Sequence, residues 1–252
     1  MVGWNILFET CHTLCSVMKE TTQISHLSRP PNENNRKILH LFADTGIEDE
    51  ILSAYGNVVR VGINPTENPF STVIQSDARD PALSGDFDLA VAHPQCQKFS
   101  RSTNGTGNPN EYENQIPDAR SVCENLADHY IIENVPQAPL RSPVIFEGGM
   151  FGLPIHYPRA FETSFKVPQP DKSPRFKPKE GPLGEQGEKG KAWVGTTEGW
   201  RLAKGYNYNW PGRNLKRHGI PAAYIKRLIY WWLTAVENNT RSVQTAITNE
   251  QY

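Results

Sequence analysis

The sequence has few cysteines and no long apolar run. Four cysteines in 252 residues are too few for a disulfide scaffold. Cys11 and Cys15 have no second pair that would complete a zinc site, so we expect no bound metal. No apolar run reaches the roughly 18 residues of a membrane helix, and no basic stretch followed by an apolar run marks a secretory signal. We therefore expect a reducing, cytoplasmic location and no contact with a membrane.

The chain also lacks an excess of charge of either sign. It has 26 Lys and Arg against 27 Asp and Glu. Overall charge therefore gives no indication of nucleic-acid binding, although basic residues can still gather on one face. The length suits one α/β domain with a proper core, or one such domain with a small appendage.

Short apolar runs alternate with helical stretches from Lys37 onward. The strands we expect are residues 37–42, 57–63, 72–75, 87–92 and 129–132. Helical spacing covers residues 47–55, and a second helix is expected over 116–127. This alternation predicts an α/β fold with a doubly wound, mostly parallel sheet of the Rossmann-like type.

The composition divides the chain further. We expect an N-terminal extension and linker (1–36), a catalytic and cofactor domain (37–163), a small irregular segment (164–213), a C-terminal helix that packs back on the domain (214–236) and a polar tail (237–252). The irregular segment interleaves aromatic with basic residues. It either contacts and stacks on nucleic acid or covers the sheet.

Polar or reactive residues stand where four of the predicted strands end. They are Asp44 with Gly46, Asp77, Pro94–Gln97, and Glu133 with Asn134. Ligands of open α/β sheets bind at the carboxyl ends of the strands. Cys96 is there either a small buried hydrophobe or a nucleophile. Glu133 is either a solvated strand end or a carboxyl with a raised pKa that donates a proton or hydrogen bond.

Taken in order, these residues resemble the motifs of DNA cytosine-C5 methyltransferases. The resembling stretches are Phe42–Gly46, Asp77, Pro94–Gln97, Glu133–Val135, Phe151–Pro154, Arg159–Glu162 and Gly219–Ala222. They span roughly residues 38–235 in the family's order. The run from Asn64 to Glu162 is similar to short viral and archaeal DNA methylase-like members.

The resemblance implies that the chain methylates carbon 5 of cytosine in DNA, with S-adenosylmethionine as the methyl donor, on the fold of that cofactor's methyltransferases. Cys96 would attack carbon 6, Glu133 would contact N3, and Arg159 would hold O2. The implied cofactor contacts are Phe42, Asp44, Thr45, Gly46, Asn64, Asp77 and Pro94.

The target base would have to flip out of the duplex into the site. A long Gly- and Asn-rich segment, residues 98–118, follows Cys96 directly and is either a functional loop that closes over DNA or a plain surface loop. The implied nucleic-acid contacts are Gln97, Lys98, Ser100, Arg101 and Asn134. The short recognition segment indicates a short target sequence or a partner protein that assists recognition.

Several positions depart from the family's pattern. Asp44 stands where the family usually has Gly, and Asn64 lies where an acid would bind the ribose. Ile155 and Tyr157 replace the usual Gln and first Arg of the late motif. Two other functions therefore stay open: methylation of RNA or of a free pyrimidine nucleotide, and a catalytically inactive binding module.

Overall fold

The computed structural model describes residues 35–100, 103, 105, 107–171 and 196–249, with side chains as far as residue 240. The chain divides into a unit of residues 1–35 and a unit of residues 36–252, and every element below belongs to the second unit. Residues 1–34 of the expected N-terminal extension, residues 172–195 of the irregular segment, and Arg101 lie outside the described residues.

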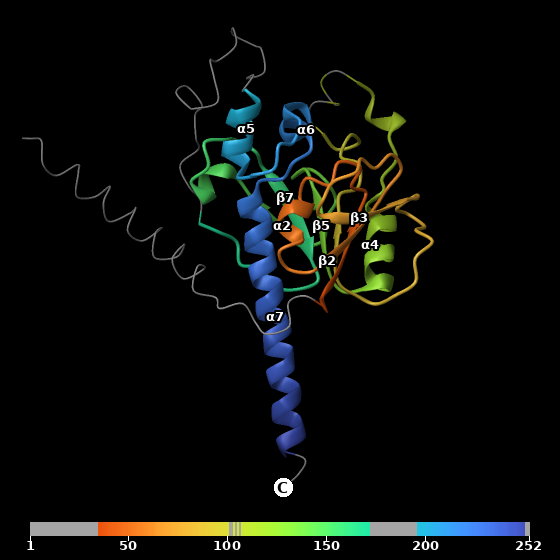
Figure 1. Ribbon diagram of the computed structural model, residues 1–252, viewed down its shortest axis with the longest axis vertical. Coiled ribbons are helices and arrows are strands. Elements are labelled where there is room, and N and C mark those ends of the chain that lie inside the picture. The colour runs from red at the N-terminus through yellow and green to blue at the C-terminus, as the bar shows by residue number, and fades with distance from the viewer. Residues whose placement is uncertain (1–34, 101–102, 104, 106, 172–195, 250–252) are drawn as a thin grey trace, which may run out of the picture. The chain divides into compact units, whose positions relative to one another are not determined.

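The strands of the described part form one seven-stranded sheet (Figure 1). They are β1 (Lys37–Leu41), β2 (Asn57–Gly62), β3 (Ser71–Gln75), β4 (Phe87–Ala92), β5 (Ala127–Asn134), β6 (Val144–Phe146) and β7 (Arg159–Thr163). Their order is β3-β2-β1-β4-β5-β7-β6, in which β1 to β5 are parallel and β7 is antiparallel to β5 and β6. The predicted Rossmann-like, mostly parallel sheet is thereby confirmed.

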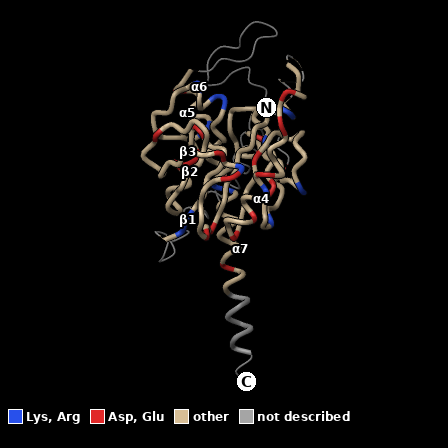
Figure 2. The backbone as a smooth tube through the Cα atoms, turned by 90° about the vertical axis from the view of Figure 1, so that its right-hand side faces the viewer, with Lys and Arg blue, Asp and Glu red and all other residues tan. Residues whose placement is uncertain are grey.

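The helices cover both faces of this sheet. They are α2 (Asp49–Leu52), α4 (Ile116–Leu126), α5 (Thr197–Lys204), α6 (Gly212–Arg217) and α7 (Ala222–Asn249). Successive side chains of a strand point to opposite faces. In β1, Ile38 joins the apolar cluster under α2 and α7, whereas Leu39 and Leu41 join the cluster under α4. Acidic and basic residues are interspersed along the backbone (Figure 2).

Some element ends differ from the prediction. β5 includes Glu133 and Asn134, because its last residues pair with β7. α2 is a single turn within the expected 47–55. α7 continues to Asn249, well past the expected end at residue 236, and residues 222–249 contain no Gly or Pro that would stop it. No helix in the described part of the chain is long and apolar enough to span a membrane.

A buried ionic network fastens α2 to the first three strands. Asp49 lies between His40 Nδ1, 2.5 Å from its Oδ1, and Arg60 Nε, 2.9 Å from its Oδ2, and all three side chains are fully buried. Ser71 donates a further hydrogen bond to Oδ2 at 2.7 Å. Burial raises the pKa of Asp49, but the charge and hydrogen bonds of its partners outweigh this, so that the pKa is lowered.

Arg60 carries the same network into the turn after β1. Its Nη1 donates to the carbonyls of Ala43 and Asp44, each at 2.8 Å. Gly46, in the same turn, has a φ of +57°, and a Cβ there would collide with Asp49 and Arg60. The network therefore sets the shape of the turn that holds several of the expected cofactor residues.

Replacing Arg60 by Leu should lower the free energy of unfolding by about 3–5 kcal/mol, because it leaves the buried Asp49 without its main cation. The matched control is Arg141→Leu. Arg141 pairs with Glu124 at 3.4 Å, with its side chain 65% exposed, so its loss should cost less than about 1 kcal/mol. Urea unfolding followed by circular dichroism measures both values. Equal losses in the two variants would contradict the structural role given to the network.

Candidate active site

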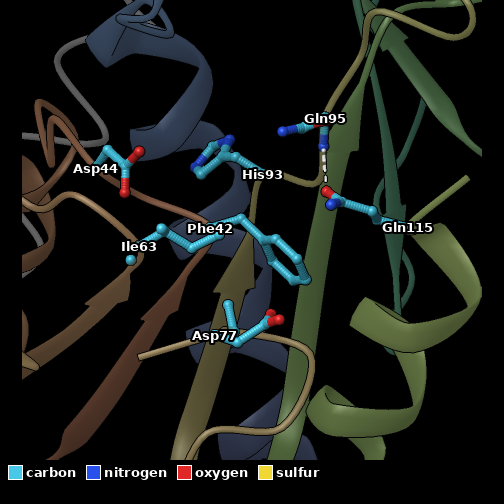
Figure 3. A pocket seen from close by; sticks show the side chains of 9 residues that line it. Phe42, Asp44, Ile63, Asp77, His93, Gln95 and Gln115 are labelled. Atoms are coloured by element: carbon cyan, nitrogen blue, oxygen red, sulfur yellow. Dashed lines mark hydrogen bonds between the residues drawn. The ribbon is translucent and has the colours of Figure 1, made fainter. Parts of the chain in front are cut away.

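A cleft opens at the carboxyl ends of β1 to β4 (Figure 3). It holds about 400 Å³ of empty space, part of it open to solvent. Its lining residues are Phe42, Asp44, Gly62, Ile63, Asp77, Ala78, His93, Gln95 and Gln115. The chain turns away in opposite directions from β1 and β4, so this edge is the switch point at which doubly wound sheets bind ligands.

Three of the seven expected cofactor residues line this cleft: Phe42, Asp44 and Asp77. Phe42 has a φ of 56°, a left-handed conformation that non-glycine residues seldom adopt. Asp44 Oδ1 accepts a hydrogen bond from the backbone N–H of Asn64 at 3.1 Å. The carboxylate packs so closely on Gly62 that a Cβ there would collide with it. Asp44 is thereby held at the cleft by the segment that follows β2.

Asp77 already has a cation beside it. Arg79 donates to both of its oxygens, at 2.6 Å from Nη2 and 3.0 Å from Nε, and also reaches Glu113 at 3.0 Å. The hydrogen bonds from Arg79 lower the pKa of Asp77. A ligand at this end of the cleft would therefore meet a carboxylate and a guanidinium together.

The other four expected cofactor residues lie outside the lining. Gly46 is buried against the Asp49 network, and Thr45 beside it is half-buried. Asn64 takes part through its backbone, which fixes Asp44. Pro94 is buried, and its carbonyl accepts a hydrogen bond from Asn134 at 2.9 Å. These four residues therefore support the wall of the cleft without lining it.

The structure brings together the three expected catalytic residues, which come from separate elements. Glu133 is the second-last residue of β5, and Arg159 is the first residue of the neighbouring strand β7. Arg159 Nε lies 2.8 Å from Glu133 Oε1 in an ion pair, with the two side chains 17% and 10% exposed. Cys96 is half-buried in the segment after β4, near enough to both for their charges to act on its thiol.

The electrostatics of Cys96 follow from this placement. Burial raises the pKa of the thiol, the charge of Glu133 raises it further, and Arg159 lowers it. Because the thiolate is the nucleophilic form, Cys96 needs either a base or an added positive charge when it reacts. The buried Cys123 differs, since burial raises its pKa to about 12 and it lies on the inner face of α4.

His93 is a site residue that the sequence reasoning missed. Its Nδ1 lies 3.0 Å from Glu133 Oε2, so both oxygens of Glu133 are engaged by side-chain nitrogens. A ligand that binds to Glu133 therefore either shares one of these oxygens with its present partner or displaces that partner. Gln115 was missed as well, and its Oε1 accepts a bond at 3.1 Å from the N–H of Gln95, which belongs to the expected stretch Pro94–Gln97 (Figure 3). The position of His93 directly after a buried strand was the available signal.

The expected nucleic-acid residues are divided among different environments. Gln97 is exposed, Ser100 is half-buried, and Lys98 Nζ donates to the Tyr112 carbonyl at 3.1 Å. Asn134 is a correction: it is fully buried, and its amide holds Pro94 and the Val135 N–H rather than facing solvent. The segment after Cys96 is also shorter than expected, because α4 begins at Ile116.

Of the aromatic residues described between positions 196 and 213, most are buried. Trp200, Tyr206 and Trp210 are buried in the cluster with α7, whereas Tyr208 is 41% exposed. Glu50 of α2 accepts bonds from the N–H groups of residues 207 and 208 and from Trp210 Nε1, at 2.7, 3.2 and 2.9 Å. For the three buried rings, covering the sheet replaces the alternative of stacking on DNA.

This covering segment also reaches the candidate catalytic residues. Lys204, at the end of α5, is fully buried and donates to the carbonyls of Leu215 and Gly219 at 2.6 and 2.5 Å. Its Nζ lies 3.8 Å from the centre of the Tyr157 ring, and the Arg159 guanidinium lies 3.9 Å from the same ring. Tyr157 thus links α5 to Arg159 by two cation–π contacts.

The reactivity of Cys96 should follow the two charges beside it. We expect its alkylation by iodoacetamide to have a midpoint above the free-thiol pKa of about 8.5. Glu133→Gln should move the midpoint to lower pH, and Arg159→Gln should move it to higher pH. Peptide mass spectrometry measures each cysteine separately, with Cys123 as an unreactive internal control. A midpoint at Cys96 that neither variant moves would contradict this arrangement.

No family model matches the chain, and no curated protein matches its sequence. Among solved structures, the chain is similar to a candidate RNA methyltransferase from Pyrococcus horikoshii (12% identity, TM-score 0.32, 42% of this chain and 53% of that one). It is also similar to a candidate methyltransferase of an antibiotic biosynthesis pathway from Anabaena variabilis (12% identity, TM-score 0.31, 49% and 48%). A third is a TehB-like SAM-dependent methyltransferase from Corynebacterium glutamicum (13% identity, TM-score 0.29, 55% and 86%). The alignments span about half the length of the first two proteins.

Proposed function

We propose that the chain methylates carbon 5 of cytosine in DNA, with S-adenosylmethionine as the methyl donor. The observation that carries this proposal is the convergence of Cys96, Glu133 and Arg159 beside a cleft at the switch point of the sheet. A thiol, a carboxyl and a guanidinium are the groups that covalent activation of a pyrimidine ring requires. The sequence resemblance assigns the same three residues to this chemistry.

The cleft suits an adenosyl cofactor in its polar groups and in its place at the carboxyl ends of the strands. Asp44 offers a carboxylate, one oxygen of which is held by the Asn64 N–H, while the other can accept from a ribose hydroxyl. Asp44 would thus replace the ribose-binding acid that the sequence lacks after β2. Phe42 supplies an apolar surface, and Asp77 lies on the same cleft. When bound there, S-adenosylmethionine supplies an electrophilic methyl group.

The protein's own residues would perform the remaining steps. The Cys96 thiolate bonds to carbon 6 of a flipped cytosine, while Glu133 contacts N3 and Arg159 holds O2 against the charge that develops on the ring. Carbon 5, now electron-rich, takes the methyl group. A base removes the proton from carbon 5, and those electrons restore the ring double bond as the bond from carbon 6 to sulfur breaks.

Methylation of RNA or of a free pyrimidine nucleotide is the second candidate. The burial of Trp200, Tyr206 and Trp210 favours the free nucleotide in particular, because these rings are not available to stack on the bases of DNA or RNA. The same thiol and carboxyl would serve, since carbon 5 of a pyrimidine is the common feature.

Incubation with tritiated S-adenosylmethionine and unmethylated duplex DNA of mixed sequence tests the proposal. We expect label in DNA as 5-methylcytosine with the wild type and with Cys123→Ser. The rate should fall by at least about a thousandfold in Cys96→Ser, as in other enzymes that lose their nucleophile.

Three outcomes would count against the proposal. Label that persists in DNA with Cys96→Ser would mean attack on another atom. Label in parallel RNA or nucleotide samples alone would favour the second candidate. Binding of S-adenosylmethionine by equilibrium dialysis without any methyl transfer would leave a binding module.

A further inference from the structure

Two histidines meet at the edge of the candidate active site, with their rings in edge-to-face contact. His40 lies in β1 and is fully buried, and His93 follows the adjacent strand β4. Their ring centres are 5.0 Å apart, and the rings are inclined at 70°. The β1–β4 pairing fixes this approach, because the His93 N–H donates to the Leu41 carbonyl at 3.1 Å.

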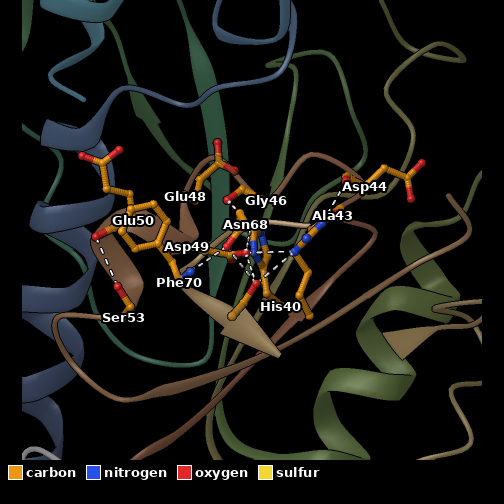
Figure 4. A network of polar contacts seen from close by, with 12 residues as sticks. His40, Ala43, Asp44, Gly46, Glu48, Asp49, Glu50, Ser53, Asn68 and Phe70 are labelled. Carbon is orange, nitrogen blue, oxygen red and sulfur yellow. Dashed lines mark hydrogen bonds and ion pairs between the residues drawn. The ribbon is translucent and has the colours of Figure 1, made fainter. Parts of the chain in front are cut away.

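Each of these histidines has a carboxylate on one ring nitrogen and no partner on the other. His40 Nδ1 lies 2.5 Å from Asp49 Oδ1 (Figure 4), and His93 Nδ1 lies 3.0 Å from Glu133 Oε2. Both Nε2 atoms are buried and have no hydrogen-bond partner in the described part of the structure. Buried polar atoms are seldom left unpaired, so this pair requires an explanation.

The carboxylates determine which ring nitrogen can bind an ion. A carboxylate that accepts Nδ1–H leaves the lone pair of the neutral ring on Nε2, which is the atom that then binds a metal ion. Carboxylate–histidine–metal arrangements have this pattern. Here the carboxylate–histidine part of this arrangement occurs twice, once with Asp49 and once with Glu133.

Glu48 adds a third ligand to the pair. It is 4% exposed, and its Oε1 accepts from the Ile220 N–H at 2.6 Å, which leaves its second oxygen for an ion. The donor atoms of His40, Glu48 and His93 all lie within 4.8 Å of one another. Zinc binds nitrogen at about 2.0–2.1 Å, so its tetrahedral donors stand roughly 3.3 Å apart. The three side chains would have to close by up to about 1.5 Å.

The surrounding charges also suit a cation. Glu48, Asp49 and Glu133 are opposed by Arg60 and Arg159. Burial lowers the pKa of Lys204, the other basic side chain whose charge acts on this group, well below its usual value, and thereby disfavours the positive charge opposed to the carboxylates.

We propose that His40 Nε2, His93 Nε2 and the Glu48 carboxylate bind a divalent transition-metal ion of the zinc class. Imidazole nitrogens with one carboxylate suit zinc and its neighbours, whereas Mg²⁺ and Ca²⁺ prefer oxygen ligands alone. Three protein ligands leave a coordination position open. Through His93, the ion would also position Glu133. The proposal goes beyond the proposed methyl transfer and does not depend on it.

The test is a titration of the chelator-treated full chain with Zn²⁺ by calorimetry and with Co²⁺ by visible absorption. Cys11 and Cys15 are first changed to Ser, because with His12 they offer soft ligands elsewhere in the sequence. We expect one ion per chain and visible bands of Co²⁺ bound by imidazole. These readouts need neither DNA nor S-adenosylmethionine, so that their failure and a failure of methyl transfer are separate results.

Variants assign the ligands. His40→Gln and His93→Gln should each weaken Zn²⁺ binding by more than 100-fold. Asp49→Asn removes the charge of the carboxylate that orients His40, and it should weaken Zn²⁺ binding by about 10- to 100-fold. The matched control is His156→Gln, because His156 Nδ1 also pairs with a glutamate, Glu147, at 3.0 Å but lies outside the cluster. The Zn²⁺ affinity of this control variant should equal that of the unsubstituted chain.

A second measurement uses the chain with all three ligands intact, so that its result does not depend on whether the variants fold. Imidazole ¹⁵N spectra of the chain should show the Nε2 signals of His40 and His93 shifting together when one equivalent of Zn²⁺ is added. The absence of Zn²⁺ binding would overturn the proposal. So would unchanged affinity in both histidine variants, or shifts confined to other histidines.

Discussion

The ion pair between Glu133 and Arg159 connects the parts of this molecule that matter for its chemistry. It forms because the end of β5 pairs with the beginning of β7, which places two residues far apart in sequence side by side at low exposure. The second oxygen of Glu133 holds His93, and His93 lies against His40. The same carboxylate therefore belongs both to the candidate catalytic group and to the histidine pair.

Three consecutive acids at the start of α2 show how one short element organises the rest. Glu48 holds the N–H of Ile220 just before α7, Asp49 joins His40 to Arg60, and Glu50 anchors the covering segment through Trp210. A helix of four residues has little stability of its own. Its place is set by these buried contacts, so the covering segment and the floor of the cleft depend on the same turn.

The sequence predicted the parallel part of the sheet well, because β1, β2 and β4 are largely apolar runs that are buried along most of their length. It missed β6 and β7, which have three and five residues and depend on pairing with distant strands. The resemblance to DNA cytosine-C5 methyltransferases identified Arg159 as a candidate, whereas the spacing of apolar residues did not. His40 and Glu48 could not be found in this way, since a polar residue within an apolar run gains its meaning from partners that only the fold supplies. The direction of the aromatic rings at positions 200, 206 and 210 was open for the same reason.

The most direct test of the account is to trap the covalent step at Cys96. A DNA duplex that contains 5-fluorocytosine should take the thiolate at carbon 6 and the methyl group at carbon 5. It should then remain attached, because fluorine cannot be removed as the proton is. We predict a protein–DNA adduct that requires S-adenosylmethionine, and tryptic mass spectrometry should place it on the peptide that contains Cys96. An adduct at another residue, or ordinary methylation of cytosine with no adduct on the fluorinated duplex, would contradict the account.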